Sequence, residues 1–204
     1  MRGSIPSELV RALRLTLVVA VVTGLIYPLV ITGAAQVAFH DQANGSLVTK
    51  NGQTVGSRLI GQYFTKPEYF HGRLSSTVDP SNPTRALPYN AANSAGSNLG
   101  PSNKALIDRV SKDVNTTRQE NGLPSGTQVP VDLVTSDFSG VDPDVSEAAA
   151  LIQVNRVASA RNLDPAKVRS LIERHVQGRV LGMFGEAHVN VLDVNMALDS
   201  GEAR

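Results

Sequence analysis

The stretch LTLVVAVVTGLIYPLVITGAAQVAF, residues 15–39, decides the architecture of this chain. It runs for 25 residues without a charged side chain. Because a helix needs about 20 mostly apolar residues to cross a bilayer, we predict one transmembrane helix here. A cleaved signal peptide is the alternative, with Gly33-Ala34-Ala35 as its cleavage site. The apolar region of a signal peptide typically spans only about 7–15 residues, which favours the membrane helix.

The orientation of this helix follows from the basic residues around it. Arg2, Arg11 and Arg14 precede the apolar stretch, and the next Lys or Arg is Lys50. The positive-inside rule therefore places the N-terminus in the cytoplasm. The predicted organisation is a cytoplasmic tail over residues 1–14, a transmembrane helix over 15–39 and an extracytoplasmic domain over 40–204.

Small and polar residues recur at every fourth position within the apolar stretch. Glycine lets another backbone approach closely, and Thr and Gln can hydrogen-bond to a neighbouring helix where lipid offers no partner. The proline lacks an N–H, which predicts a kink or help from a partner helix. We predict that this face packs on a partner, with a plain lipid anchor as the alternative. The face consists of Gly24, Pro28, Thr32 and Gln36.

The composition excludes several classes of function. The formal net charge of the 204 residues is +1, aromatic residues make up 4% and Trp is absent, so nothing favours nucleic-acid binding. The chain has no Cys, which excludes disulfides and thiolate catalysis. The residues after the apolar stretch are numerous enough for one hydrophobic core.

The region after residue 40 mixes helical and strand patterns, which predicts one α+β domain with few strands. Two Asn-Gly pairs around Leu47-Val48 indicate a turn, a strand and a second turn. Further strands are predicted at residues 55–64, 131–135 and 189–192. Three helices are predicted: one from Pro101-Ser102 to Asn121-Gly122, one beginning at Asp142-Pro143 and Ser146, and one from Asp164-Pro165 to Gly178.

Residues 67–103 form a long polar stretch rich in Gly, Pro, Ser and Asn. It is too long for an idle loop in a compact domain. Disorder is one interpretation. We favour an ordered interaction loop, because six larger apolar or aromatic residues are interleaved as if to be buried: Tyr69, Phe70, Leu74, Leu87, Tyr89 and Leu99.

Motifs for catalysis, metals and phosphates are missing from the sequence. The four His residues do not form a metal-ligand spacing, and there is no Gly-x-Ser-x-Gly elbow. Residues 56–61 imitate the start of a phosphate loop, but Gln62 and Tyr63 stand where Lys and Ser or Thr are required. Asp142 is interpreted as a helix cap. We therefore predict no catalytic residues, no metal site and no cofactor, with a membrane-tethered periplasmic enzyme or a solute-binding protein as the rival interpretations.

Nine short segments, spread in order along the chain, form a recognisable set. They are GLIYPL (24–29), GSRLIGQ (56–62), PEYFHGR (67–73), GSNLGPSN (96–103), PVDLVT (130–135), SGVDP (139–143), QVNRVA (153–158), GE (185–186) and VNVL (189–192). Together these segments resemble the C subunit of the bacterial Kdp potassium-transporting ATPase. Departures from that family are local: Leu74 replaces a usual Pro, Val141 a Leu, and Asp144 a frequent His.

The resemblance implies a non-catalytic subunit of a potassium pump in the bacterial inner membrane. The implied partners are a channel-like potassium-binding subunit, the P-type ATPase catalytic subunit, a small single-span subunit and the lipid bilayer. ATP and potassium are then ligands of the complex. Tyr69, Phe70, Arg73, Asn98, Gly100 and Asn103 are candidates for subunit contacts. For the last segment the alternative is structural, with Ser102 capping a helix and Asn98 closing a turn.

The family is also described as a catalytic chaperone that raises the nucleotide affinity of the ATPase subunit. In that description Ser139, Gly140 and Gln153 are candidate nucleotide contacts. The positive-inside rule opposes it, because it places Ser139 outside the cytoplasm, where there is no ATP.

Overall fold

The computed structural model describes residues 5–203 and divides the chain into two compact units, Met1–Leu47 and Val48–Arg204. The architecture is α+β, as predicted, with a long apolar helix at the N-terminus. Arg2, one of the three basic residues behind the predicted orientation, lies outside the described residues.

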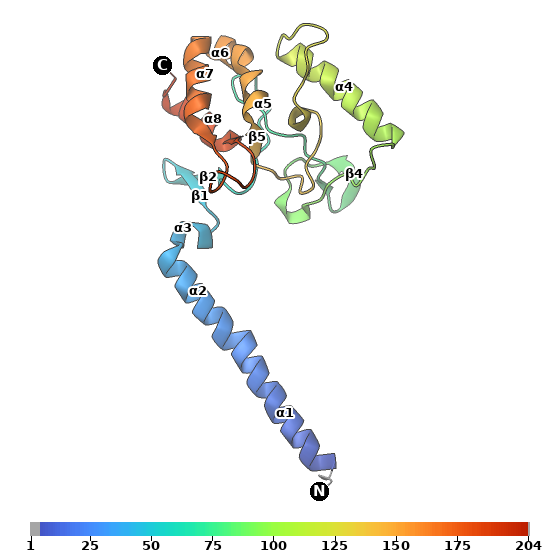
Figure 1. Ribbon diagram of the computed structural model, residues 1–204, viewed down its shortest axis with the longest axis vertical. Helices are drawn as coiled ribbons and strands as arrows, with labels where there is room; N and C mark the ends of the chain where they lie inside the picture. The colour runs from blue at the N-terminus through green and yellow to red at the C-terminus, as the bar shows by residue number, and fades with distance from the viewer. Residues whose placement is uncertain (1–4, 204) are drawn as a thin grey trace. The chain divides into compact units, whose positions relative to one another are not determined.

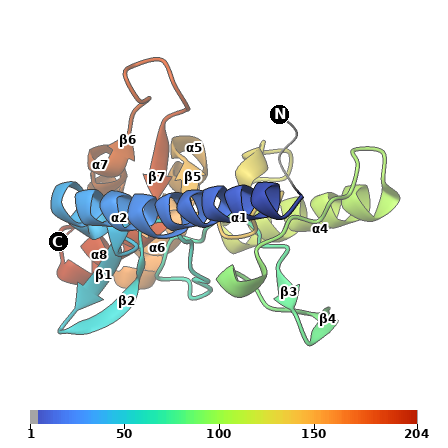
Figure 2. The same ribbon diagram turned by 90° about the horizontal axis from the view of Figure 1, so that it is seen from below.

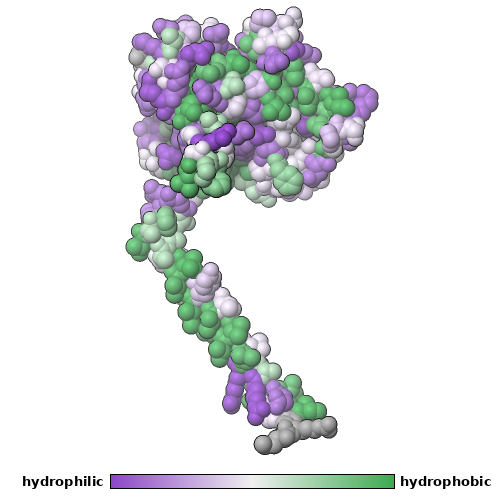
Figure 3. Space-filling model, in the orientation of Figure 1, coloured by the Kyte–Doolittle hydropathy of each residue, from purple (hydrophilic) through white to green (hydrophobic). Residues whose placement is uncertain are grey.

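The first unit is dominated by a helix built from α1 (Ile5–Val21), a π-helical turn η1 (Val22–Ile26) and α2 (Tyr27–Ala38). Within residues 5–203 it is the one helix long and apolar enough to cross a membrane, with a mean hydropathy of 2.3 in its most apolar window. Figure 3 shows hydrophobic surface along most of it and hydrophilic side chains near its N-terminal end. The helix begins before the predicted residue 15, in a polar turn that carries an ion pair between Arg11 and Glu8 at 2.9 Å.

The π-helical turn accommodates Pro28. A proline cannot donate to the carbonyl four residues earlier, which here belongs to Gly24. The helix widens immediately before the proline, and Tyr27 N–H donates to the carbonyl of Val22 instead. The expected distortion of the helix is therefore a π turn, a common adjustment at such positions.

Gln36 finds a hydrogen-bond partner within its own unit. Its amide exchanges two hydrogen bonds with the amide of Asn44, at 3.0 and 3.3 Å, across the short helix α3 (His40–Ala43). Asn44 Nδ2 also lies 2.7 Å from the carbonyl of His40. The polar group of Gln36 is thus satisfied without a partner helix, so its amide alone does not require one.

The predicted turn, strand and turn near Leu47 is confirmed as a hairpin of β1 (Leu47–Lys50) and β2 (Gln53–Ser57). Asn51 and Gly52 both have positive φ, at 52° and 76°, as the tightest hairpin turns require. The predicted strand over 55–64 is wrong beyond Ser57. Residues 58–64 form turns and irregular backbone instead, and Gly61 among them is buried so close to the ring of Tyr89 that a Cβ would clash with it.

The remaining strands of the described residues form two small sheets. In the first, β3 (Val78–Asp79) pairs with β4 (Asn82–Ala86). In the second, β7 (His188–Asn190) lies between β5 (Asp144–Ser146) and β6 (Val176–Gln177), all antiparallel. The predicted strand over 131–135 is wrong: Val131–Leu133 form a 3-10 helix, η3, and a second such turn, η2, spans Ala91–Asn93.

Helices α5 (Glu147–Leu151), α6 (Val154–Arg161), α7 (Pro165–His175) and α8 (Val191–Ser200) gather on one side of the domain, and α4 (Lys104–Glu120) lies on the other (Figure 1). Two predicted starts are confirmed, since Ser146 caps α5 and Asp164 caps α7.

Several predicted boundaries of these helices are wrong. Asn103, not Ser102, caps α4 by accepting a hydrogen bond from Ala105 N–H at 2.9 Å. Asp142 caps no helix, since its Oδ1 accepts from Asp144 N–H in a tight turn. Helix α7 ends at His175 because β6 begins at the next residue, and the strand predicted to reach 192 stops at Asn190, which caps the unpredicted helix α8.

The hydrophobic core is formed by α5–α8 and the three-stranded sheet. Val157, Val168, Leu171, Ile172 and Val189 are fully buried in it. The long segment 67–103 is ordered and adds one side chain to this core, because Phe70 is also completely buried. Of the other five residues predicted to be buried there, three are half-buried, whereas Leu87 and Leu99 are exposed.

Candidate functional site

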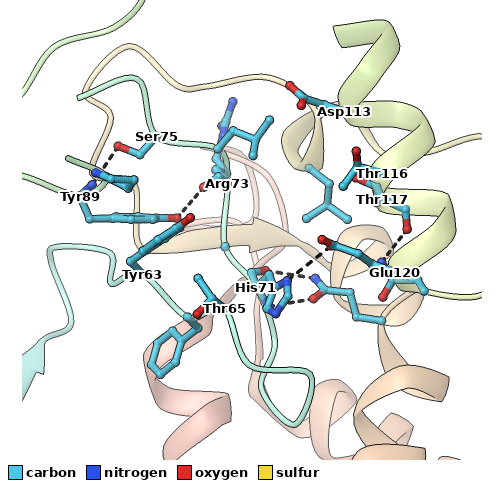
Figure 4. Close-up of a pocket in the computed structure, with 17 residues that line it drawn as sticks. Tyr63, Thr65, His71, Arg73, Ser75, Tyr89, Asp113, Thr116, Thr117 and Glu120 are labelled. Carbon is cyan, nitrogen blue, oxygen red and sulfur yellow. Dashed lines mark hydrogen bonds and ion pairs between the residues drawn. The ribbon is translucent and has the colours of Figure 1, made fainter. Parts of the chain in front are cut away.

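The main recess of the second unit is a pocket of about 360 Å³ between the segment 63–75 and helix α4. In Figure 4, Tyr63 and Tyr89 lie on one side of it, Thr116 and Glu120 of α4 lie on the other, and His71 lies below. Polar and apolar residues both line it: His71, Arg73 and Glu120 are among the polar ones, and Phe64, Leu74 and Leu133 among the apolar ones.

The floor of the pocket is held by Gln153, which lies at the break between α5 and α6. The N–H of His71 donates to Gln153 Oε1 at 2.8 Å, and Gln153 Nε2 donates to the carbonyl of His71 at 3.1 Å. Nε2 also donates to Ala149 O at 3.0 Å. The side chain of Gln153 is only 1% exposed, and both polar atoms of its amide are hydrogen-bonded to other groups of the protein.

Arg156 extends this network to the chain before the pocket. Its guanidinium donates to Gln153 Oε1 at 2.6 Å, to Asn121 Oδ1 at 3.0 Å, and to the carbonyls of Pro67 and Tyr69 at 2.6 and 2.9 Å. One charged side chain thus fixes residues 67–71 against α6 and the end of α4. One sequence signal could have linked the two residues, because a residue three positions after Gln153 lies on the same face of a helix.

The opposite wall depends on Tyr89. Its hydroxyl donates to the carbonyl of Arg73 at 2.6 Å, and burial raises its pKa above the ordinary value. Arg73 in turn pairs with Asp142 at 3.2 Å. Gly61 and Gly72 lie so close to this tyrosine that a side chain at either position would collide with it.

His71, Asp113 and Glu120 are among the titratable side chains that line the pocket. His71 Nδ1 lies 3.9 Å from Glu120, and burial together with Arg156 lowers the pKa of the imidazole, which favours its neutral form. Burial raises the pKa of Asp113 on α4. No three His, Asp or Glu side chains within residues 5–203 are grouped as metal ligands.

Only one of the three candidate nucleotide contacts lines the pocket. Gln153 lines the pocket, whereas Ser139 and Gly140 lie outside its lining. They form a turn closed by Asp137, whose carboxylate accepts from both backbone N–H groups at 2.7 and 2.9 Å. Gly140 has φ of 70°, and an added Cβ would lie 2.6 Å from the side chain of Thr77. Close packing accounts for this glycine.

Among the first group of predicted subunit contacts, only two have accessible side chains. Tyr69 is half-buried, with its hydroxyl 3.2 Å from Asp199 and its ring 4.8 Å from the guanidinium of Arg161. Arg73 is half-buried and paired, as described above. Phe70 is fully buried, so its side chain belongs to the core and offers no surface to a partner.

The second group, in the segment 94–103, is exposed at the surface. Asn98 adopts a left-handed conformation with φ of 53°, and its amide makes no hydrogen bond within the described part of the chain. Gly100 has open space around it. Asn103 is occupied as the cap of α4. Subunit contact by these residues stays a prediction, now centred on Asn98 and Gly100.

The sequence matches the family described as "K+-transporting ATPase, c chain" over residues 9–200. A potassium-transporting ATPase KdpC subunit of Rhodopseudomonas palustris (strain BisB18) is 53% identical over 199 residues, covering 96% of this chain and 98% of the relative. The KdpC subunit of Bradyrhizobium diazoefficiens is 51% identical over 97% of this chain and 98% of its own. That of Methylobacterium nodulans is 54% identical over 92% and 96%.

These matches extend through the apolar N-terminal helix, the segment 67–103 and the pocket. With half of the residues identical over nearly the full length, this chain belongs to the KdpC family, the c chains of potassium-transporting ATPases.

Proposed function

We propose that this chain is a non-catalytic subunit that assembles and stabilises the ATP-driven Kdp potassium uptake complex in the bacterial inner membrane. The observation that carries the proposal is the full-length match to relatives named as subunits of that ATPase, anchor and domain together. Because the match includes the N-terminal apolar helix as well as the domain, it supports assembly with partners in the membrane. Its partners are then the channel-like potassium-binding subunit, the P-type catalytic subunit and the small single-span subunit.

The chemistry of the pocket supports a role without catalysis. The amide of Gln153 and the guanidinium of Arg156 are bound to backbone carbonyls and to each other. A catalytic group would need a polar atom left available to a substrate, in reach of a nucleophile or base. This arrangement instead supports a rigid domain whose surface is used for binding.

Any effect on the ATP affinity of the catalytic subunit would be indirect in this proposal. The predicted orientation separates the domain from cytoplasmic nucleotide, and Gln153 has no free polar atom to offer it. The chain would favour one conformation of the assembled pump, and the nucleotide site would respond through that conformation.

The anchor supplies a second contact surface in the proposal. Gly24 and Gly33 both have open space where a side chain would stand, so another backbone can come close at either position. In a membrane such small residues favour helix pairing. Pro28 fixes the π turn between α1 and α2, which sets the relative direction of the two halves.

Purification in mild detergent tests the proposal. The tagged full-length chain, expressed with the other Kdp subunits, should carry all of them through a two-step purification, and the same preparation should hydrolyse ATP in response to potassium. The chain purified alone should show no hydrolysis above background. Purification as a lone protein in the presence of the other subunits, or turnover by the lone chain, would overturn the proposal.

A further inference from the structure

The loop between β6 and β7 carries an apolar tip that the domain does not cover. Figure 2 shows this loop extending beyond the other elements of the domain. The tip comprises Val180, Leu181, Met183 and Phe184, whose exposed fractions are 65%, 82%, 70% and 60%. Four large apolar side chains within five residues are an unusual exposure for a soluble surface, and such patches mark interaction sites.

The backbone of the tip is fixed by hydrogen bonds. Val180 N–H donates to the carbonyl of Phe184 at 2.9 Å, and Phe184 N–H donates back at 3.0 Å. Leu181 and Gly182 between them both have positive φ, at 54° and 73°. The loop therefore presents its side chains from a defined tight turn.

Leucine is an unfavourable residue at position 181, because the turn requires a positive φ there. Positive φ at consecutive turn residues favours Asn, Asp and Gly, and a leucine there is strained. Packing within the domain does not offset the strain, because the side chain is 82% exposed. Strain and exposure together at one side chain point to a contact made outside this chain.

Charges flank the tip on both arms of the loop. Arg179 and Glu186 are exposed, and neither forms an ion pair within residues 5–203. The two charges cancel, and residues 178–187 contain no Lys, Trp or Tyr. Loops that enter lipid usually carry a basic surplus and interfacial aromatics, so these features favour a protein surface over a bilayer.

We propose that the apolar tip docks into an apolar groove on another protein subunit of the same membrane complex. The groove would carry a carboxylate facing Arg179 and a basic group facing Glu186. Leu181 and Phe184 act as the anchoring side chains, in the manner of interface hot spots. The inference rests on the proposed function, since it assigns part of the surface through which the subunit binds the pump.

A photo-reactive residue in place of Leu181 tests the contact directly. In the full complex, illuminated in native membranes, it should form an adduct with another subunit, identified by mass spectrometry. An adduct confined to lipid would assign the tip to the bilayer, and one with a second copy of this chain would assign it to self-association. Either result, or no adduct in an intact complex, overturns the inference.

Leu181→Asn tests its energetic importance without damaging the turn. Asparagine tolerates positive φ, so the melting temperature of the chain should be unchanged or raised. The yield of the assembled complex should fall at least about tenfold, as for loss of a hot spot. Val131→Asn, at an exposed valine of η3, is the matched control and should assemble normally.

The outcomes separate the two proposals. If the unaltered chain fails to purify with the other subunits, the proposed function fails and the docking contact with it. If the unaltered chain and Leu181→Asn assemble equally well, only the docking contact is wrong.

Discussion

The side-chain amide of Gln153 and the backbone of His71 exchange two hydrogen bonds. The N–H of His71 donates to Gln153 Oε1 at 2.8 Å, and Gln153 Nε2 donates to the carbonyl of His71 at 3.1 Å. A buried side-chain amide here does what a neighbouring strand does in a sheet, because it satisfies both polar groups of a backbone segment that has no strand partner. The same carbonyl oxygen of Gln153 accepts from Arg156 at 2.6 Å. Order in the segment 67–73 therefore depends on this residue.

Gln153→Ala should destabilise the chain by about 2–4 kcal/mol, because it leaves the part-buried N–H and carbonyl of His71 and part of the Arg156 guanidinium without these partners. Thermal unfolding followed by circular dichroism measures the change. Asn155→Ala, two residues away at an exposed position, is the control and should stay within about 0.5 kcal/mol. An unchanged melting temperature for Gln153→Ala, with weakened ATP affinity of the pump, would instead support a nucleotide contact.

Gly140→Ala should destabilise the domain by about 1–3 kcal/mol, because φ of 70° is unfavourable for alanine and the new methyl group would meet Thr77 and the carbonyl of Ala95 at 2.6 and 2.7 Å. Gly178→Ala is the matched control, since no described atom lies within 4 Å of its added Cβ. The melting temperatures of the two variants make the comparison. Equal tolerance at both positions would contradict the close packing at Gly140.

Local chemistry explains which elements could be predicted from the sequence. Ser146 and Asp164 cap their helices by bonding to N–H groups two or three residues ahead, so the signal and the structure lie in the same short segment. The apolar run of residues 15–39 predicts a long apolar helix from its length and lack of charge, without any knowledge of distant contacts.

The errors arise where contacts distant in sequence decide the outcome. Residues 131–135 have strand propensity, but the carboxylate of Asp132 accepts from Ser146 N–H at 2.6 Å and holds them in a turn. Asn190 lies in β7, as predicted, but the strand ends there instead of at residue 192. Its amide bonds to Arg58 O and Asp144, and from that position it begins α8. The pocket was unpredictable for the same reason, since Arg156 binds a carbonyl 89 positions away.

Acid should weaken the fold through His71. Burial and Arg156 lower the pKa of the folded imidazole below 6.5, its value in the unfolded chain. The unfolded state therefore binds its proton first, so stability is full above about pH 6.5 and falls as the pH drops below it. Denaturation midpoints at pH 7.5 and 5.5 should differ in the native chain and differ less in His71→Gln.

Asp144 should have the opposite effect on the pH dependence of stability. Burial raises the pKa of its carboxyl group, so its protonation favours the folded state and acts in the opposite sense, at lower pH. An identical pH response of His71→Gln and the native chain would show that groups other than His71 control it.

The predicted orientation can be read by cysteine labelling, because the natural chain contains no Cys. In the chain expressed alone, Val131→Cys in the domain should react with an impermeant maleimide added to intact spheroplasts. Ala12→Cys in α1 should react only after lysis. The reverse pattern would place the domain in the cytoplasm and bring Ser139 and Gly140 into the compartment that contains ATP.

The contact predicted for Asn98 is best tested with glycine. Asn98 has φ of 53° and an exposed amide without a partner in the described part of the chain. Alanine there costs about 1–2 kcal/mol for its left-handed conformation, whereas glycine adopts it freely. Asn98→Gly should therefore keep the melting temperature while it lowers the yield of the assembled pump or its apparent potassium affinity.

Gly100→Ala completes the comparison. The space around Gly100 is open and its φ is ordinary, so the added methyl group should leave the melting temperature within about 0.5 kcal/mol of unfolding free energy. On a contact surface the same methyl group would hold the partner away and reduce assembly. If Asn98→Gly and Gly100→Ala both assemble normally, while Asn98→Ala lowers the melting temperature, the segment 94–103 serves only the fold of its own domain.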